Sequence, residues 1–227
     1  MIFRQFFDQI SCTYTYLIAS DKGREALIID PVLEKTDSYI KLLEQLDLRL
    51  VKVIDTHLHA DHISGMAKLH DKTKCATLMG EQSQVEVVTM LVKDDEKIKI
   101  EGIELKALYT PGHTEDSYSF LMNDRVFTGD TLLIRGTGRT DFQNGNSYDQ
   151  YNSLFERLLK LKETTLVYPA HDYKGETVST IGEERKYNPR LQVNSAKEYV
   201  EIMSNLRFAN PKMMDVALPA NKKGIIR

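Results

Sequence analysis

One seven-residue segment constrains this chain more than any other: Thr56 to His62, with the sequence THLHADH. It holds three imidazoles and one carboxylate, and the apolar, β-branched run 50–54 before it predicts a strand that delivers them at its carboxyl end. Neutral imidazole and carboxylate are common ligands of Zn, Fe and Mn, and an ordinary surface or core has no reason to gather them. The segment therefore predicts a metal centre.

The spacing inside this segment suits two neighbouring metal positions. Alternate side chains of an extended chain point the same way, so His57 and His59 can face one pocket. Asp61 and His62 fall where we expect a helix over about 61–71 to begin. One short segment can thus serve two adjacent positions.

Three more candidate ligands follow other predicted strands. His113 closes a Pro-Gly turn, Asp130 ends the run TGD, and His171 ends the run PAH, whereas His70 stands apart from these motifs. Each could singly be a turn, capping or surface residue. Together they predict a centre assembled from several loops that gather at one edge of the sheets.

The order of the predicted elements indicates a layered α/β fold. We expect helices near 36–47, 148–161 and 195–205, and strands at about 12–19, 25–30, 50–55, 75–79, 97–100, 103–109, 117–122, 125–129 and 165–168. Strands flanked by helices fit stacked layers. At 227 residues we expect a single domain, 1–227, whose turn-rich tail from about 210 wraps over the body.

Composition and charge exclude several function classes. No apolar run approaches the length of about 20 residues that crosses a bilayer, so we expect no membrane insertion. The net charge of −3 and the lack of a Lys/Arg stripe argue against nucleic acid. The first residues lack the features of a signal or transit peptide, which predicts a cytoplasmic protein. Cys12 and Cys75 are expected to be small buried thiols.

The ordered motifs THxHxDH, PGHT, TGD and PAH resemble those of the metallo-β-lactamase superfamily, which implies an αββα sandwich with metals at its edge. Within that superfamily, the segments 133–143, 168–173 and 188–190 resemble the glutathione persulfide dioxygenase family. The resemblance covers nearly the whole chain, including 216–221 near its end. Thr137 departs from it where some relatives carry Cys, and we expect no loss of function from this change.

The resemblance implies a single Fe(II) per chain, held by His57, His113 and Asp130. Two His and one carboxylate form the facial triad of non-haem Fe(II) oxygenases, which leaves positions open for substrate and O₂. The resemblance also implies that the remaining candidates are present but not all metallated: His59, Asp61, His62 and His171. Residue identities alone equally allow two metals bridged by Asp130, so the count of one rests on the resemblance.

Two residues are expected from the resemblance to bind glutathione. Arg190 offers a fork for a carboxylate and Tyr173 a hydroxyl donor. The alternatives are a partly buried core Tyr and a surface Arg in an ion pair. Arg139, which sits among glycines, could touch substrate, but we favour a structural brace of the metal loop through Asp141.

The resemblance implies an iron-dependent dioxygenase that oxidises glutathione persulfide with O₂ and water to sulfite and glutathione. No sulfurtransferase domain is fused here, so a separate sulfurtransferase or free glutathione chemistry would supply the persulfide, and a homodimer is compatible with the sequence. The main alternative is a glyoxalase II-like thioester hydrolase, although the longer helical C-terminal part of that family is not evident. A further alternative is a metal-dependent binding or sensing protein without turnover.

Overall fold

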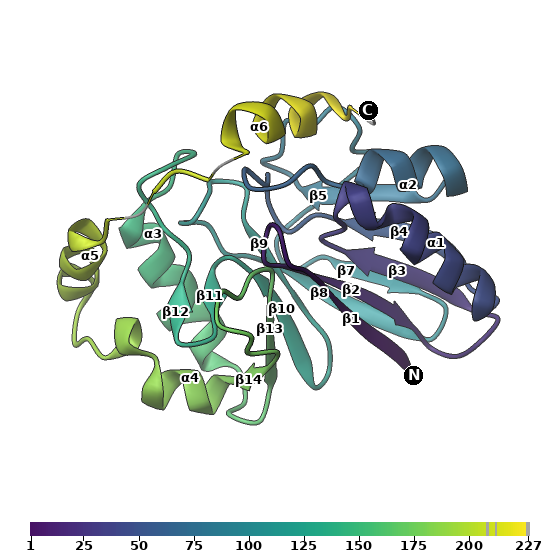
Figure 1. The fold of residues 1–227 in the computed structure, drawn as a ribbon. Helices are drawn as coiled ribbons and strands as arrows, with labels where there is room; N and C mark the ends of the chain where they lie inside the picture. Colours follow the sequence, from purple (N-terminus) through teal and green to yellow (C-terminus); the bar gives the residue numbers. More distant parts are fainter. Residues whose placement is uncertain (208, 212, 226–227) are drawn as a thin grey trace.

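Two β-sheets face each other at the centre of the computed structural model, which describes residues 1–207, 209–211 and 213–225 (Figure 1). Within this part of the chain, the first sheet has the order β1 (Ile2–Asp8), β2 (Thr13–Ala19), β3 (Glu25–Ile29), β4 (Arg49–Ile54), β5 (Ala76–Gly80) and β6 (Met90–Val92). The second has the order β14 (Ser179–Thr180), β13 (Leu166–Pro169), β10 (Arg125–Gly129), β9 (Tyr118–Leu121), β8 (Ile103–Tyr109) and β7 (Lys97–Ile100). A small hairpin, β11 (Leu132–Leu133) and β12 (Gly136–Thr137), follows β10.

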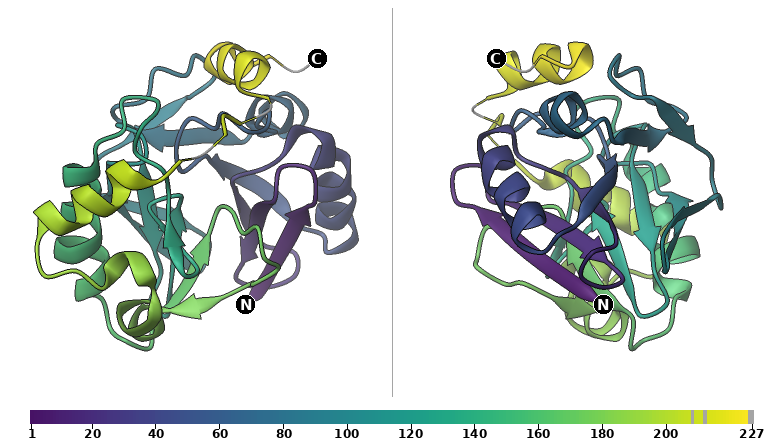
Figure 2. Two further views of the ribbon diagram at one scale, coloured as in Figure 1. Left: turned by 60° about the vertical axis from the view of Figure 1, so that its left-hand side comes forward. Right: turned by 90° about the vertical axis from the view of Figure 1, so that its right-hand side faces the viewer.

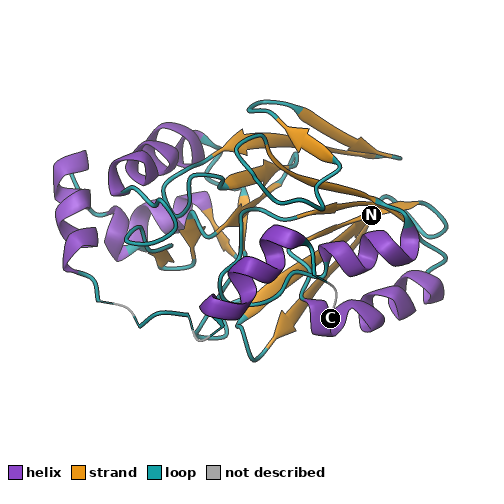
Figure 3. Cartoon of the chain, turned by 90° about the horizontal axis from the view of Figure 1, so that it is seen from above, coloured by secondary structure: helices purple, strands orange, loops and turns teal. Residues whose placement is uncertain are grey.

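Helices cover the outer face of each sheet, as the view from above shows (Figure 3). The first sheet is covered by α1 (Thr36–Gln45) and α2 (Met66–Thr73). The second is covered by α3 (Ser147–Asn152), which continues as a π-helical turn (Ser153–Arg157) and a 3-10 turn (Leu158–Lys160), by α4 (Ile181–Tyr187) and by α5 (Ala196–Asn205). Short 3-10 turns span Leu33–Lys35 and Pro189–Leu191. The predicted order of helix, sheet, sheet and helix is confirmed.

The strand β2 shows why the sequence builds these layers. All seven of its residues are buried, because both faces of the strand are covered. Tyr16 and Ile18 point between the sheets and pack with residues such as Phe127 of the second sheet. Leu17 and Ala19 point the other way and pack under α1 and α2. Alternate side chains of one strand thus supply two cores.

Most predicted elements lie where the sequence places them, but the tail differs. Residues 214–223 form a helix, α6 (Met214–Lys223), in spite of Pro219, so the prediction of a turn-rich tail is wrong there. The strand β1 and the helix α4 were not predicted. Figure 2 shows α6 lying near α2, beside the loop between β4 and α2.

Among the described residues, none of the helices combines the length and the apolar character that crossing a bilayer requires. Cys75 is buried as expected, whereas Cys12 is half-buried.

Candidate metal centre

The candidate ligands meet because strands of both sheets end at one edge of the fold. In the first sheet β3 and β4 run parallel, and the segment from His57 to His62 follows β4. In the second sheet β10 runs parallel to β13, and β8 has the same direction because β9 is antiparallel to both β8 and β10. The loops after these three strands carry His113, Asp130 and His171. Each predicted ligand thus follows the end of a strand, and the two sheets face the same site.

The predicted helix over about 61–71 begins later than expected. Its first residue is Met66, so Asp61 and His62 lie in the preceding loop. Long-range hydrogen bonds hold this loop: the backbone N–H of Leu33 donates to the carbonyl of Ile63 at 2.9 Å. The prediction failed because these partners are distant in the sequence and outweigh the local preference for a helix.

A first group of three side chains, His57, His113 and Asp130, is buried, with one ligand atom of each within 4.8 Å of the others. The Nε2 atom of His113 lies 3.6 Å from Oδ2 of Asp130, which is longer than a hydrogen bond. On the opposite side of its ring, Nδ1 of His113 donates to the carbonyl of Arg139 at 2.8 Å, which leaves the lone pair on Nε2. His113 therefore directs a ring nitrogen with a free lone pair toward Asp130.

His57 is oriented by a hydrogen-bond chain that ends on a buried carboxylate. The hydroxyl of Thr56 donates to Oδ2 of Asp30 at 3.0 Å, so Nδ1 of His57 is the donor in its 2.9 Å contact with Thr56 Oγ1. This arrangement places the His57 lone pair on Nε2. Asp30 also faces Nε2 of His59, at 3.2 Å. One carboxylate thus orients two histidines of the THLHADH segment.

The charge states of this group suit metal binding. Burial lowers the pKa of His57 and of His59 well below the ordinary value, so both rings are neutral at neutral pH. Burial alone would raise the pKa of Asp130, but the neighbouring His171 and His113 lower it below its ordinary value. A metal needs neutral imidazole and ionised carboxylate, which are the forms of His57, His59 and Asp130.

A second group contains His59, Asp61, His62 and His171, again with one ligand atom of each within 4.8 Å of the others. Three of these side chains hydrogen-bond to one another: Asp61 Oδ2 lies 2.8 Å from Nε2 of His171 and 3.0 Å from Nδ1 of His62. The other ring nitrogen of His171 lies 2.7 Å from Oδ1 of Asp130. Burial would lower the pKa of His171, but Asp130 and Asp61 raise it well above its ordinary value. His171 thus links the two groups as a shared donor.

Asp30, which orients the histidines, was missed in the sequence. It directly follows β3 and has a positive φ of 51°, an uncommon conformation for a residue other than Gly. Its Oδ1 atom accepts the backbone N–H of Thr56 at 2.7 Å. The signal was present, because an acidic residue directly after an apolar strand is the pattern that identified Asp130.

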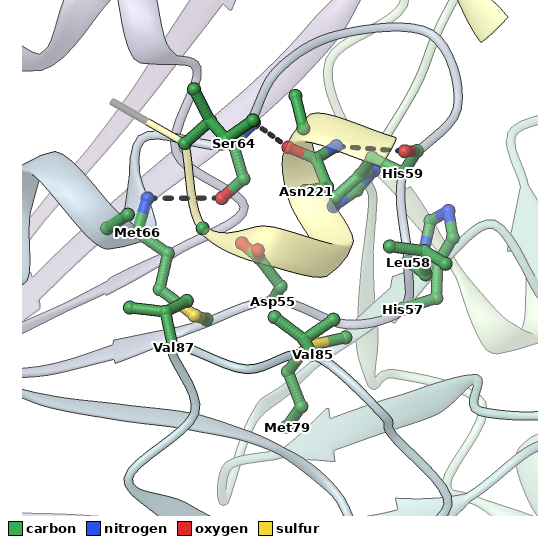
Figure 4. A pocket seen from close by; sticks show the side chains of 14 residues that line it. Asp55, His57, Leu58, His59, Ser64, Met66, Met79, Val85, Val87 and Asn221 are labelled. Atoms are coloured by element: carbon green, nitrogen blue, oxygen red, sulfur yellow. Dashed lines mark hydrogen bonds between the residues drawn. The ribbon is translucent and has the colours of Figure 1, made fainter. Parts of the chain in front are cut away.

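Asn221 on α6 was also missed as a site residue, and it fastens the THLHADH segment from the far end of the chain (Figure 4). Its side-chain amide donates to the carbonyls of His59 and His62, both at 2.9 Å. Its Oδ1 atom accepts the backbone N–H of Ser64 at 2.8 Å. The partners are 157 to 162 residues apart in sequence, and we find no local sequence signal for the contact.

The loop after β12 packs directly against His113. A Cβ atom added to Gly138 would lie 2.1 Å from the carbonyl oxygen of Asp130 and 2.8 Å from Nδ1 of His113. The backbone N–H of Gly138 donates to that same carbonyl at 2.7 Å. Close approach of the backbone therefore requires glycine here.

A cavity of about 710 Å³ opens over the metal groups. Its lining includes His57, His113, Asp130 and His171, together with Tyr173 and Arg190. Such a volume accommodates a ligand of small-peptide size. The structure thus brings the predicted substrate-binding residues and the first group of ligands to one cavity.

Tyr173 and Arg190 reach this cavity in different ways. The Tyr173 ring lies parallel to the His171 imidazole, with 6.2 Å between ring centroids, and is largely exposed. The guanidinium of Arg190 donates to the carbonyl oxygen of Thr137 and to Thr137 Oγ1. Arg190 is thereby held in a fixed position at the cavity wall.

Arg139 makes contacts that connect two loops. Its Nε and Nη2 atoms donate to the two carboxylate oxygens of Asp141, at 2.7 and 2.9 Å, and Nη1 donates to the carbonyl of Ala209 at 2.9 Å. His70 lies apart from both metal groups, in α2, with Nδ1 at 2.7 Å from the carbonyl of Cys75.

Comparisons with known proteins relate this architecture to characterised families. The sequence model described as "Metallo-beta-lactamase superfamily" matches residues 13–171. The chain is 42% identical over 226 residues to "Persulfide dioxygenase ETHE1, mitochondrial" of Homo sapiens, covering 98% of this chain and 88% of that protein. A crystal structure of ETHE1 from Myxococcus xanthus superposes with a TM-score of 0.95 at 47% identity, covering 98% of each chain. A probable hydroxyacylglutathione hydrolase of Schizosaccharomyces pombe is 29% identical, over 89% of this chain and 90% of that protein.

Proposed function

This chain belongs to the metallo-β-lactamase superfamily and, within it, to the persulfide dioxygenases, and from that premise we propose that it oxidises glutathione persulfide at a single Fe(II). The reaction consumes O₂ and water and yields sulfite and glutathione. Family membership makes the chain an enzyme and argues against a binding or sensing protein without turnover. Family membership also supports a metal cofactor, because the structure has buried groups of His and Asp residues that could hold a metal ion.

The observation that carries the single-iron proposal is the geometry of His57, His113 and Asp130. His57 and His113 each keep a lone pair on Nε2, and Asp130 is ionised, so the three offer the ligand set of a facial triad. Bound Fe(II) would supply the redox chemistry and leave coordination positions for substrate and O₂. Thr56 and Asp30 orient the ring of His57, and the carbonyl of Arg139 orients the ring of His113.

His171 links the second group to the first. It faces a carboxylate with each ring nitrogen, Asp130 at 2.7 Å and Asp61 at 2.8 Å. We assign Asp61 and His171 a role in orienting Asp130, and the proposal of one metal rests on the family to which the chain belongs.

Substrate binding is assigned to Arg190 and Tyr173 at the wall of the cavity. The guanidinium is anchored on Thr137, which fixes its position at the cavity wall, and a guanidinium suits a glutathione carboxylate. The Tyr173 hydroxyl is exposed in the same cavity and would donate to the peptide part of the substrate. Arg139, bonded to Asp141 and to the carbonyl of Ala209, would brace the loop that carries the hydrogen bond to His113.

A thioester hydrolase is the second candidate, and one observation favours it. Ligand atoms for two adjacent metals are all present, and the S. pombe relative is named as a hydroxyacylglutathione hydrolase. Metals held by these residues would activate water for hydrolysis of the thioester. The higher identity to the human persulfide dioxygenase favours the dioxygenase.

The metal content of anaerobically purified protein tests these assignments. We expect one iron per chain, with oxygen uptake on glutathione persulfide and little hydrolysis of a glutathione thioester. Two tightly bound zinc ions with full activity on the thioester would instead make the protein a hydrolase.

The setting of the reaction also belongs to this proposal. The persulfide would come from a separate sulfurtransferase or from free glutathione chemistry. The name of the human relative describes a mitochondrial protein, so the cytoplasmic location stays a prediction. The homodimer also stays a prediction.

A further inference from the structure

Glu184 of α4 carries a carboxylate in the interior of the protein, behind the wall of the cavity rather than in its lining. The residue has no exposed surface. Its two oxygens accept four hydrogen bonds, from Ser179 Oγ at 2.6 Å, Asn188 Nδ2 at 2.8 Å, the backbone N–H of Arg135 at 2.9 Å and Nη1 of Arg135. Burying a carboxylate is costly unless it is paired and hydrogen-bonded, and these bonds join α4 to three other segments of the chain.

One of these segments is the turn of the hairpin β11–β12, which forms part of the cavity wall. The hairpin has two residue pairs, and so short a ribbon is not stable by itself. Arg135 at its turn has a positive φ of 55°, which costs free energy in a residue that carries a Cβ atom. Glu184 accepts from both the backbone and the guanidinium of Arg135. Glu184 therefore holds the hairpin in place.

The hairpin in turn holds the guanidinium of Arg190. Nη1 of Arg190 donates to the carbonyl oxygen of Thr137 and lies 3.1 Å from Oγ1 of the same residue. Thr137 ends β12 and pairs with Leu132 across the hairpin. A displaced hairpin would therefore carry away the group on which the guanidinium is anchored.

Asn188 connects Glu184 to the backbone of Arg190. Its side chain is fully buried, and Nδ2 donates to Glu184 at 2.8 Å and to the carbonyl of Gly136 at 2.9 Å. Both of these partners are acceptors, so the amide oxygen points the other way, where it accepts the backbone N–H of Arg190 at 3.1 Å. Glu184 thus reaches Arg190 by two routes, through its backbone and through the anchor of its guanidinium.

We propose that Glu184 is a positioning residue for substrate binding, which fixes where the Arg190 guanidinium lies in the cavity without touching the substrate. This inference rests on the proposed function, in which Arg190 binds a carboxylate of the glutathione part. A guanidinium already in place binds a carboxylate more tightly, because ordering a long side chain during binding costs conformational entropy. Glu184 therefore contributes to affinity for glutathione rather than to metal binding.

The test is a double-mutant cycle on glutathione affinity, which needs no turnover. Calorimetry without oxygen gives the dissociation constant of glutathione for the iron-loaded wild type, Glu184→Gln, Arg190→Ala and the double variant. Gln keeps the shape of Glu but cannot accept all four hydrogen bonds. We expect roughly 10-fold weaker binding by Glu184→Gln, a typical effect within one hydrogen-bond network. The double variant should match Arg190→Ala, because Glu184 acts through Arg190.

Glu163→Gln is the matched control, because it removes an exposed ion pair with Arg185 of the same helix. It should bind glutathione like the wild type. Iron content and melting temperature verify that each variant is folded and loaded. If Glu184→Gln does not fold, Asn188→Ala takes its place in the cycle, since it interrupts one route nearer to Arg190.

Two results would show that Glu184 supports the fold without positioning Arg190. One is wild-type affinity in the folded Glu184→Gln variant. The other is a loss of affinity that adds in full to that of Arg190→Ala. Either result overturns the inference.

The outcome is separable from that of the proposed function. Oxygen uptake with glutathione persulfide tests the dioxygenase, whereas the cycle with glutathione tests Glu184. The expected cycle in a protein without oxygen uptake would overturn only the dioxygenase. Wild-type affinity in Arg190→Ala, or no measurable affinity in the wild type, would overturn the inference together with the role of Arg190.

Discussion

The Nε2 atom of His113 and the Oδ2 atom of Asp130 lie 3.6 Å apart, each held in place by a hydrogen bond on its far side. His113 is held by the carbonyl of Arg139, and Asp130 by Nδ1 of His171. Two groups able to bond to each other are thus kept apart by their other partners. This is the arrangement expected of two ligands that share one metal.

The first prediction separates ligands from their neighbours. His113→Ala and Asp130→Ala should each lose iron and oxygen uptake with glutathione persulfide, because two remaining ligands no longer form a facial triad. Asp61→Ala should keep iron and lose about 10- to 100-fold in affinity or activity, as for other residues that orient ligands. Iron analysis beside oxygen uptake measures both.

His70→Ala is the matched control, because His70 bonds to the carbonyl of Cys75 away from the centre. It should retain iron and activity. Loss of a second metal equivalent together with all turnover in Asp61→Ala would contradict the single-metal assignment.

A second prediction concerns substrate affinity. Arg190→Ala should raise KM for glutathione persulfide roughly 10- to 100-fold with iron content intact, because it removes a charge-assisted hydrogen bond worth about 1.5–3 kcal/mol. Arg190→Lys should also raise KM, since an ammonium cannot reproduce the fork. Arg24→Ala, which breaks an exposed ion pair with Glu101, serves as control. An unchanged KM in Arg190→Ala would remove Arg190 from the binding site.

A third prediction follows from the amide of Asn221. Asn221→Ala should weaken iron binding and lower the free energy of unfolding by at least about 1–3 kcal/mol, because two carbonyls and one N–H lose their partner in the interior. Asn221→Asp should weaken iron binding too, since it still accepts from Ser64 but turns an oxygen toward the two carbonyls. Competition with a chelator gives the affinity.

The control for Asn221 is Asn205→Ala, whose exposed amide bonds to the carbonyl of Glu201 on α5. It should leave the chelator titration unchanged. If Asn221→Ala released iron no more readily than this control, α6 would have no part in holding the centre.

A fourth prediction tests the close packing behind His113. Gly138→Ala should displace His113 and empty the iron site, because the added Cβ would lie 2.1 Å from a backbone oxygen. Gly136→Ala is a control two positions away, where the nearest atom lies 3.9 Å from the added Cβ. Iron content and melting temperature distinguish the two variants. Equal iron content in Gly138→Ala and Gly136→Ala would show that the loop after β12 can move to make room for the added Cβ.

The sequence predicted which candidate ligands come together, because each of them has a local signature. His57, His113, Asp130 and His171 all follow short apolar runs, and the carboxyl ends of such strands meet at one edge. The layers were predictable for the same reason, since strand periodicity marks both faces of a segment such as β2. Family resemblance then added the identity of the reaction.

Other features had no local signature. The residues before Met66 resemble a helix start, yet a loop forms because Asn221 and Leu33 bond to its backbone from distant positions. Pro219 suggested turns, but it is tolerated inside α6, where it costs a backbone donor. The hydrogen bond from the backbone N–H of Arg135 to Glu184 likewise joins segments that only the folded chain brings together.

The hydrogen bond from Asn221 to the carbonyl of His59 joins positions 162 residues apart, and this separation has a consequence for the order of events during biosynthesis. The ribosome synthesises the segment from His57 to His62 long before it synthesises α6, which carries Asn221. Domains tend to fold as units during synthesis, beginning from the N-terminal side. Nascent chains would therefore display imidazoles that are not yet locked in place. The chain would then reach its full affinity for metal only after α6 is synthesised. A ribosome-stalled chain that ends before Asn221 would release its metal readily.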